Sequence, residues 1–166
     1  MKICIRYYGE IIVLEATSIG LGTCWIGGTY NKKECEKYID IKEDEELVCV
    51  IAIGYTPENK SIKEKLVAAM NKGKKGYNEI LKSKDNKVPN WVKSGIESVI
   101  KAPSAVNKQP VGYLFEDNKI KAYVVKENHG YEEVDLGISM LNFEIGSKSK
   151  GYIGHWTYIN NENIFE

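Results

Sequence analysis

Arginine is almost absent from this chain of 166 residues, which carries it only as Arg6. The 23 basic and 23 acidic residues give a formal net charge of zero. No overall positive field therefore favours binding to nucleic acid or to an anionic membrane surface. No apolar run approaches the roughly 20 residues that a membrane-spanning helix needs. We predict neither a nucleic-acid partner nor a membrane partner.

The cysteines form no CxxC pair, and only two histidines accompany them. They stand at irregular separations, as Cys4, Cys24, Cys35 and Cys49. Such spacing argues against a zinc site, and a free cysteine in an apolar run behaves as a small hydrophobe. We therefore expect no metal, and reduced thiols in a cytoplasmic protein.

The N-terminal residues resemble a signal peptide only superficially. Lys2 and Arg6 precede the apolar stretch 11–14, but Glu10 and Glu15 interrupt the run and no cleavage pattern follows. We expect the protein not to be exported.

The length favours one domain, residues 1–166, that buries roughly two-thirds of the surface of its unfolded chain. Two halves, about 1–58 and 90–166, are joined by a polar, Lys-rich connector. Within the connector, helical turns are expected around 63–70 and 77–81. Its lysines fit a solvated face, and charge alone assigns them no function.

In the first half, residues 9–19 are apolar nearly all round and end at Gly20, which predicts a buried helix closed by a glycine cap. Residues 23–26 are expected to be a short extended segment. Residues 47–53 form an unbroken apolar run rich in β-branched residues, and this predicts a strand buried on both faces.

In the second half, apolar residues at helical spacing predict an amphipathic helix over 90–101, which Pro103 stops. Residues 111–115 and 120–125 predict a hairpin of antiparallel strands. Apolar residues between 134 and 145 predict a largely buried helix, and 152–158 a final strand. The predicted class is α+β.

Two turn-rich segments each follow a helix-like run: GLGTCWIGG at 20–28 and APSAVNKQP at 102–110. Each offers backbone N–H groups and small polar side chains to a planar, anionic cofactor. The second contains a Pro-Ser dipeptide, two residues, Asn, one residue, then Gln-Pro. These positions are Pro103, Ser104, Asn107, Gln109 and Pro110, with Val111 where a tryptophan is common.

With these residues the chain resembles the nitroreductase family. The resemblance implies that the 102–110 loop holds the isoalloxazine and ribityl parts of FMN. Ser104, Asn107 and Gln109 would offer the donors and acceptors that the flavin pyrimidine edge requires, beside Pro103. Lys108 would lie near that edge and favour the anionic reduced flavin.

The GLGTCW run is also common in the family, and through it Gly22, Thr23 and Gly28 would bring main chain close to the flavin. Two alternatives remain open. Ser104 and Asn107 also suit a structural role, satisfying helix carbonyls and turn amides. The glycine-rich run also suits a capped helix that leads into a core strand.

The order of the two motifs is reversed relative to ordinary nitroreductases, as in a permuted single-chain branch of the family in which two related halves resemble the usual homodimer. Further likenesses are Tyr8-Gly9-Glu10, Ile53-Gly54-Tyr55 and the run 134–138. The family's Arg-x-Ser-x-Arg pattern, which grips the FMN phosphate, is absent. Lysine can supply such a charge without the bidentate fork, and the candidates are Lys72, Lys74 and Lys75.

The resemblance implies a three-layer fold with a mixed, mainly antiparallel central sheet flanked by helices. It implies an FMN-dependent oxidoreductase that passes electrons from NAD(P)H to a small electron-poor acceptor such as a nitroaromatic or quinone. No side chain is expected to be catalytic, because the cofactor carries the chemistry. A homodimer is expected, since flavins in this family lie at subunit or pseudo-subunit interfaces.

Two other hypotheses remain. The chain is alternatively a truncated or degenerate member with weak or no flavin binding, acting as a binding module. In the third hypothesis, both motifs are turns of an unrelated α+β domain.

Overall fold

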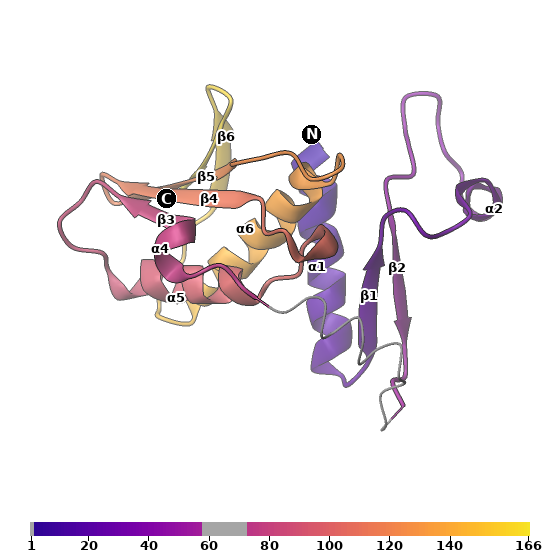
Figure 1. The fold of residues 1–166 in the computed structure, drawn as a ribbon, viewed down its shortest axis with the longest axis horizontal. Coiled ribbons are helices and arrows are strands. Elements are labelled where there is room, and N and C mark those ends of the chain that lie inside the picture. The colour runs from indigo at the N-terminus through magenta and orange to yellow at the C-terminus, as the bar shows by residue number, and fades with distance from the viewer. Residues whose placement is uncertain (1, 58–72) are drawn as a thin grey trace. The chain divides into compact units, whose positions relative to one another are not determined.

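The computed structural model describes residues 2–57 and 73–166 (Figure 1). The chain divides into two compact units, one formed by Met1–Glu10 with Ser61–Glu166 and the other by Ile11–Lys60. Secondary structure is mixed α and β, which confirms the predicted α+β class. The expected helix at 63–70 lies outside the described residues.

The larger unit is built on a sheet of five strands in the order β3-β4-β5-β7-β6. Its strands are β3 (Leu81–Ser83), β4 (Val111–Glu116), β5 (Lys119–Val124), β6 (Trp156–Ile159) and β7 (Glu162–Phe165). β3 runs parallel to β4 and the other neighbours are antiparallel. The sheet is therefore mixed and mainly antiparallel, as predicted.

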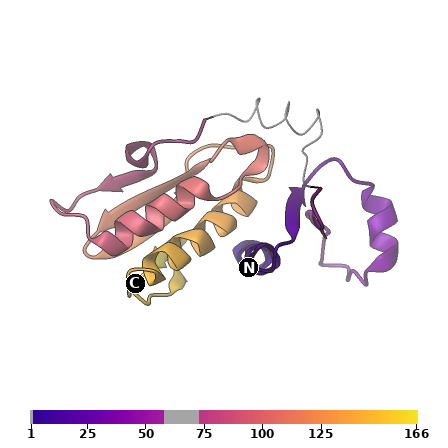
Figure 2. The same cartoon turned by 90° about the horizontal axis from the view of Figure 1, so that it is seen from below.

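Two helices, α5 (Asn90–Lys101) and α6 (Glu132–Lys148), lie side by side against one face of this sheet (Figure 2). α5 has the predicted bounds, because its apolar residues recur at helical spacing and Pro103 prevents continuation. Its buried side chains include Val92, Ile96 and Val99. Burial of each such side chain stabilises the fold by roughly 1.5–3 kcal/mol.

Aromatic rings fill the space between the helices and the sheet. Tyr113 of β4 stacks on Phe143 of α6, with ring centroids 5.4 Å apart. Trp91 stacks on Tyr152 at 3.9 Å. Phe165 of β7 meets Phe143 edge to face at 5.3 Å. This cluster fixes α5 and α6 on the sheet, and the connection from α5 to β4 therefore leaves a rigid core.

The prediction of a single final strand at 152–158 is wrong. The strand begins later than predicted, and a second strand follows it. Pairing begins at Trp156, and a turn at Asn160 and Asn161 leads into β7, which the sequence analysis missed. Both turn residues have positive φ, 52° and 63°, as a two-residue hairpin turn requires. β3 was also missed, since a helical turn was expected through Leu81. Its predecessor α4 (Tyr77–Ile80) is helical as predicted.

The predicted hairpin at 111–125 is confirmed. β4 and β5 pair from Val111 with Val124 to Glu116 with Lys119. The turn residues Asp117 and Asn118 have φ values of 52° and 57°. These conformations suit a tight turn between antiparallel strands.

The first helix, α1 (Lys2–Ser18), begins well before the predicted residue 9. Its glycine cap is confirmed, because Leu21 N donates to Ala16 O and Gly20 has a φ of +84°. The prediction of a buried helix is wrong, since Ile11 and Ile12 are 41% and 53% exposed.

The smaller unit contains a two-stranded antiparallel sheet of β1 (Gly22–Ile26) and β2 (Val50–Gly54). Two short helical segments, α2 (Lys32–Cys35) and η1 (Glu36–Tyr38), lie between the strands in the sequence. The expected extended segment at 23–26 is confirmed. The strand predicted over 47–53 begins at Val50, and burial on both faces is wrong because Ile53 is 46% exposed. An apolar run predicts burial only where neighbouring elements cover it.

Candidate functional site

The loop Ala102–Pro110 connects the end of α5 to the start of β4. At the helix end, Ala102 N donates to both Ser98 O and Val99 O at 3.1 Å. Pro103 then ends the helix, because it has no N–H to donate. The loop therefore starts from a rigid point on the packed core.

Three residues of this loop other than glycine have left-handed backbone conformations. The φ values are 45° at Val106, 55° at Asn107 and 46° at Gln109. A positive φ is most unfavourable for a β-branched residue such as valine. Conformations of this kind cost roughly 1–3 kcal/mol each and gather at functional sites, where the surroundings hold them in place. The loop is therefore a candidate binding element on structural grounds.

Ser104 and Gln109 close the loop on itself. Ser104 Oγ accepts a hydrogen bond from Gln109 N at 2.9 Å. The buried Gln109 side chain accepts from Lys75 N at 2.8 Å through Oε1 and donates from Nε2 to Ile100 O at 3.2 Å. The Gln109 amide thus joins the connector to the end of α5. The Ser104 hydroxyl can still donate its own hydrogen, since a hydroxyl both accepts and donates.

Asn107 and Lys108 lie on the outer part of the loop. Asn107 Nδ2 donates to Gly73 O at 3.0 Å, and its backbone N donates to Ser104 O. The Lys108 side chain is exposed. The five predicted loop residues are therefore neighbours, and their local hydrogen bonds also support the structural role that the sequence left open.

A buried carboxylate that the sequence analysis did not select supports the loop from α6. Asp135 is 3% exposed, and its Oδ1 accepts from Ala105 N at 2.8 Å. Burial raises the pKa of this carboxyl, while the hydrogen bonds from Ala105 and Asn128 act in the opposite direction. The only sign of this role in the sequence is that Asp135 is an acidic residue within an apolar helical run.

The loop lines one side of a small hollow in the larger unit. Ser104, Gln109, Asp135 and Ser139 supply its polar lining, with Val99 and Pro110 among the apolar residues. The space that it encloses is about 10 Å³, roughly what one water molecule needs, and the figure of about 200 Å³ is reached only when space open to solvent is included. Sites for ligands of drug size or cofactors usually measure about 300–1,000 Å³. This hollow is therefore too small to enclose such a ligand.

Lys74 and Lys75 lie against the loop, a placement that the sequence alone did not give. Lys74 Nζ donates to Ala102 O at 3.0 Å, and Lys75 Nζ donates to Gln109 O at 2.6 Å. Burial lowers the pKa of both ammonium groups. Lys72 lies outside the described residues.

The remaining predicted residues, Gly22, Thr23 and Gly28, belong to the smaller unit. Gly22 and Thr23 open β1, and Gly28 lies in the bend that follows this strand. A Cβ added at Gly22 would stand 2.2 Å from Cγ2 of Thr56. Packing against Thr56 therefore explains this glycine without a cofactor.

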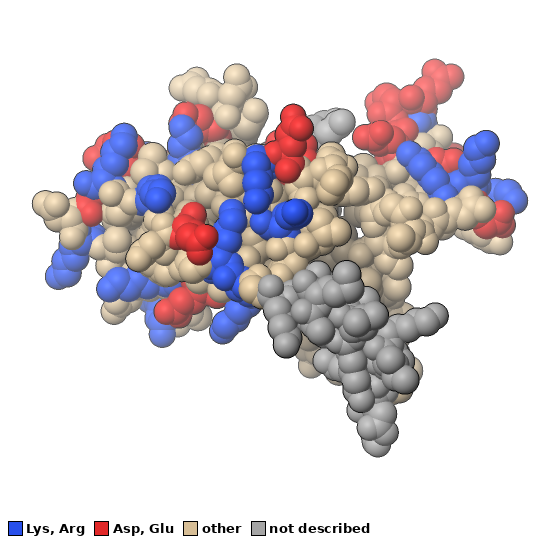
Figure 3. Space-filling model, viewed as in Figure 1, with Lys and Arg blue, Asp and Glu red and all other residues tan. Residues whose placement is uncertain are grey.

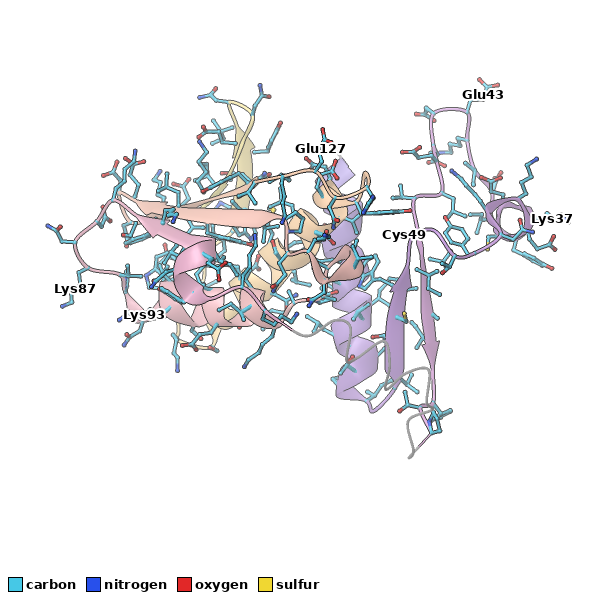
Figure 4. All side chains as sticks on the ribbon, viewed as in Figure 1. Lys37, Glu43, Cys49, Lys87, Lys93 and Glu127 are labelled. Carbon is cyan, nitrogen blue, oxygen red and sulfur yellow. The ribbon has the colours of Figure 1, made fainter. Side chains whose placement is uncertain are left out.

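Other kinds of site find no support in the part of the chain that the structure describes. No cluster of three or more His, Cys, Asp or Glu side chains there could hold a metal ion. Cys24, Cys35 and Cys49 form no disulfide bond. No helix among the described residues is long and apolar enough to cross a membrane. Figure 4 shows that Cys49 and Lys37 belong to the smaller unit, and Lys87, Lys93 and Glu127 to the larger one.

Comparison with known proteins agrees with this fold. The model of a family described as "Putative TM nitroreductase" matches residues 2–147. A crystal structure described as a putative nitroreductase from Thermotoga maritima is similar, with a TM-score of 0.68 and 19% sequence identity. The match covers 99% of this chain and 64% of that one. At this identity the likeness concerns the fold. A search of curated proteins gave no match.

Proposed function

Because this chain belongs to the family described as "Putative TM nitroreductase", we propose that it is an FMN-dependent oxidoreductase. In this proposal electrons pass from NAD(P)H to an electron-poor small molecule such as a nitroaromatic or a quinone. The observation that carries the proposal is the loop 102–110, whose strained backbone is held by partly buried hydrogen bonds beside a small hollow with both apolar and polar lining residues. A rigid, polar main-chain surface is what a planar cofactor requires.

The residues around the loop fit FMN in their chemistry. Ser104 and Asn107 present groups that both donate and accept, as the edge of the flavin pyrimidine requires. Lys108 places a positive charge on the same loop, which would favour an anionic reduced flavin. FMN, when bound, would accept a hydride from the reduced nicotinamide and release electrons to the acceptor. The protein's part is to bind, orient and exclude water.

We also propose that the protein acts as a homodimer. The hollow beside the loop is smaller than a typical cofactor site, so further walls are needed. In the smaller unit Ile12, Ile53 and Tyr55 are 53%, 46% and 92% exposed. Apolar side chains of this size on a two-stranded sheet and a helix favour a contact with another chain. Sedimentation that finds a stable monomer still binding FMN would contradict the dimer.

A degenerate member that binds flavin weakly or not at all is the second candidate. Two observations favour it: the small volume of the hollow and the use of the Gln109 amide inside the protein. Such a protein would keep the fold as a binding module.

The visible absorption spectrum of the purified protein distinguishes these two candidates. The spectrum is recorded before and after addition of FMN, with excess FMN removed by gel filtration. Flavin bands that stay with the protein and bleach when NADH or NADPH is added support the oxidoreductase. A colourless protein after loading supports the binding module.

A loop variant tests whether the site is the one described. Asn107→Ala should weaken FMN binding by about three- to tenfold, because one or two hydrogen bonds are lost. Asn86→Ala, at an exposed asparagine outside the loop, serves as the matched control and should change nothing. Near-UV circular dichroism of both variants must match the wild type. Equal FMN affinity of the two variants would place the cofactor elsewhere.

A further inference from the structure

Lysines from two separate segments, the connector and the residues after β5, meet along one side of the loop 102–110. Lys74 and Lys75 come from the connector and bond to the carbonyl oxygens of Ala102 and Gln109. Lys126 lies two residues after the end of β5. The residue between them, Val125, donates from its backbone N to Pro110 O at 2.8 Å. Figure 3 shows blue side chains gathered on the face where β4 begins and β5 ends. We call Lys74, Lys75 and Lys126 the lysine cluster.

Acidic side chains lie beside this cluster (Figure 3), but none of the ion pairs found among the described residues includes one of its lysines. Lys75 is bonded to Gln109 O, and the neighbour of Lys126, Val125, is bonded to Pro110 O, so the two lysines lie at adjacent points of the loop. Burial, and then repulsion from Lys126, lowers the pKa of Lys75. The ion pairs found among the described residues involve other lysines: Lys37, Lys84, Lys119 and Lys121. Glu79 is the acid that acts on Lys75, and its carboxylate already accepts from Gly76 N at 2.7 Å.

The cluster retains unused capacity to bind an anion. An ammonium group carries three N–H donors, and the carbonyl contacts of Lys74 and Lys75 use one from each group. Lys75 is half-buried, and a charge in such a position acts on an anion more strongly than one surrounded by water. The hydrogen bonds to the loop also hold these ammonium groups in place, which reduces the entropy lost on binding.

We propose that the lysine cluster binds a phosphate monoester, namely the phosphate of FMN in the function proposed above. A phosphate monoester has close to two negative charges at neutral pH and three strong acceptor oxygens. Lysine binds such a group as a point charge, without the bidentate geometry of arginine. The cluster thereby supplies the phosphate contact in a chain whose only arginine is Arg6. This inference rests on the proposed function only for the identity of the ligand.

The test compares FMN with riboflavin, which has the same ring and ribityl chain but no phosphate. Dissociation constants for both are measured by flavin fluorescence for the wild type, Lys75→Met, Lys126→Met and Lys93→Met. Lys93 is exposed in the first turn of α5, at the end of the helix remote from the loop, and serves as the control (Figure 4). Lys126→Met is included because no hydrogen bond of the Lys126 side chain supports the loop among the described residues.

The wild type should bind FMN more tightly than riboflavin. Lys75→Met and Lys126→Met should each weaken FMN binding by about five- to thirtyfold, since each removes a charge-assisted contact. Riboflavin binding should stay within about twofold, and Lys93→Met should change neither value. The preference for FMN should shrink as salt is added. Equal losses for both flavins, or an unchanged preference for FMN, would overturn the inference.

A flavin-free measurement separates this inference from the proposed function. Thermal unfolding is followed with increasing inorganic phosphate, against chloride at equal ionic strength. Phosphate should raise the Tm of the wild type and of Lys93→Met, and should leave that of Lys75→Met/Lys126→Met unchanged. If the wild type binds neither flavin but keeps this shift, the oxidoreductase proposal fails and the anion site stands. A wild type without the shift and without a preference for FMN has no such site.

Discussion

Asn128 and Asp135 share a buried hydrogen bond that fixes the backbone of the loop 102–110. Asn128 Nδ2 donates to Asp135 Oδ2 at 2.7 Å and also to Ala105 O at 3.0 Å. The other carboxylate oxygen of Asp135 accepts from Ala105 N. Both polar groups of the Ala105 backbone are therefore bonded to this pair. The pair stabilises a loop conformation that its own residues disfavour.

Removal of the carboxylate should destabilise the protein strongly. Asp135→Ala leaves the Ala105 N–H and one Asn128 N–H without their acceptor, and we expect the free energy of unfolding to fall by about 2–4 kcal/mol. Glu97→Ala, at an exposed acid on α5, should change it by less than about 0.5 kcal/mol. Urea unfolding monitored by circular dichroism measures both. A loss for Asp135→Ala as small as that of the control would show that the pair does not support the loop.

The Asp135 carboxyl should also make stability depend on pH. Its pKa is raised by burial in the folded state, so the folded protein binds more protons than the unfolded chain from about pH 4, the usual Asp value, up to the raised pKa. Stability from this group therefore decreases as pH rises through that window. The wild type should lose stability relative to Asp135→Asn as pH rises above about 4 toward the raised pKa, because asparagine does not titrate. Urea unfolding at several pH values tests this, and parallel curves would contradict it.

Val106 should be better replaced by glycine than by alanine. Its φ is 45° and its side chain is 64% exposed, so little burial is lost on substitution. Glycine removes a left-handed strain of about 1–2 kcal/mol and adds roughly 0.5–1 kcal/mol of backbone entropy cost. Val106→Gly should therefore raise the free energy of unfolding by up to about 1 kcal/mol, whereas Val106→Ala should change it less. A lower stability for Val106→Gly would refute strain at this residue.

Gly146 should not tolerate a side chain. A Cβ at this position would stand 2.5 Å from Ser94 O and 2.8 Å from the Cα of Gly95, both backbone atoms of α5. Gly146→Ala would force α5 and α6 apart and should cost about 1–3 kcal/mol or more. Gly54→Ala is the control, because a Cβ there meets nothing within 4 Å. Thermal unfolding of both variants measures the difference, and equal Tm values would show that the helices can separate freely.

Local patterns in the sequence determined α5, the hairpin 111–124 and the location of the candidate loop. The helical spacing of apolar residues and the proline at Pro103 predicted the bounds of α5. Both are local signals, because each depends only on residues a few positions apart in the sequence. The Pro-Ser-x-x-Asn-x-Gln-Pro spacing marked the loop for the same reason. The Asn160-Asn161 pair is also a local turn signal. However, β6 and β7 have four residues each, too few for their apolar pattern to show two strands in place of one.

Tertiary structure alone decided what surrounds the loop. Lys75 contacts Gln109 from 34 residues away, and Asp135 contacts Ala105 from 30 residues away. No local pattern encodes such pairs, because they depend on how the connector and α6 pack on the sheet. Burial is likewise a property of the fold: the apolar run containing Ile53 stays partly exposed, whereas the polar Asp135 is buried. The local sequence determines which polar groups the loop carries. Long-range packing determines that the Lys75 ammonium group and the Asp135 carboxylate lie beside it.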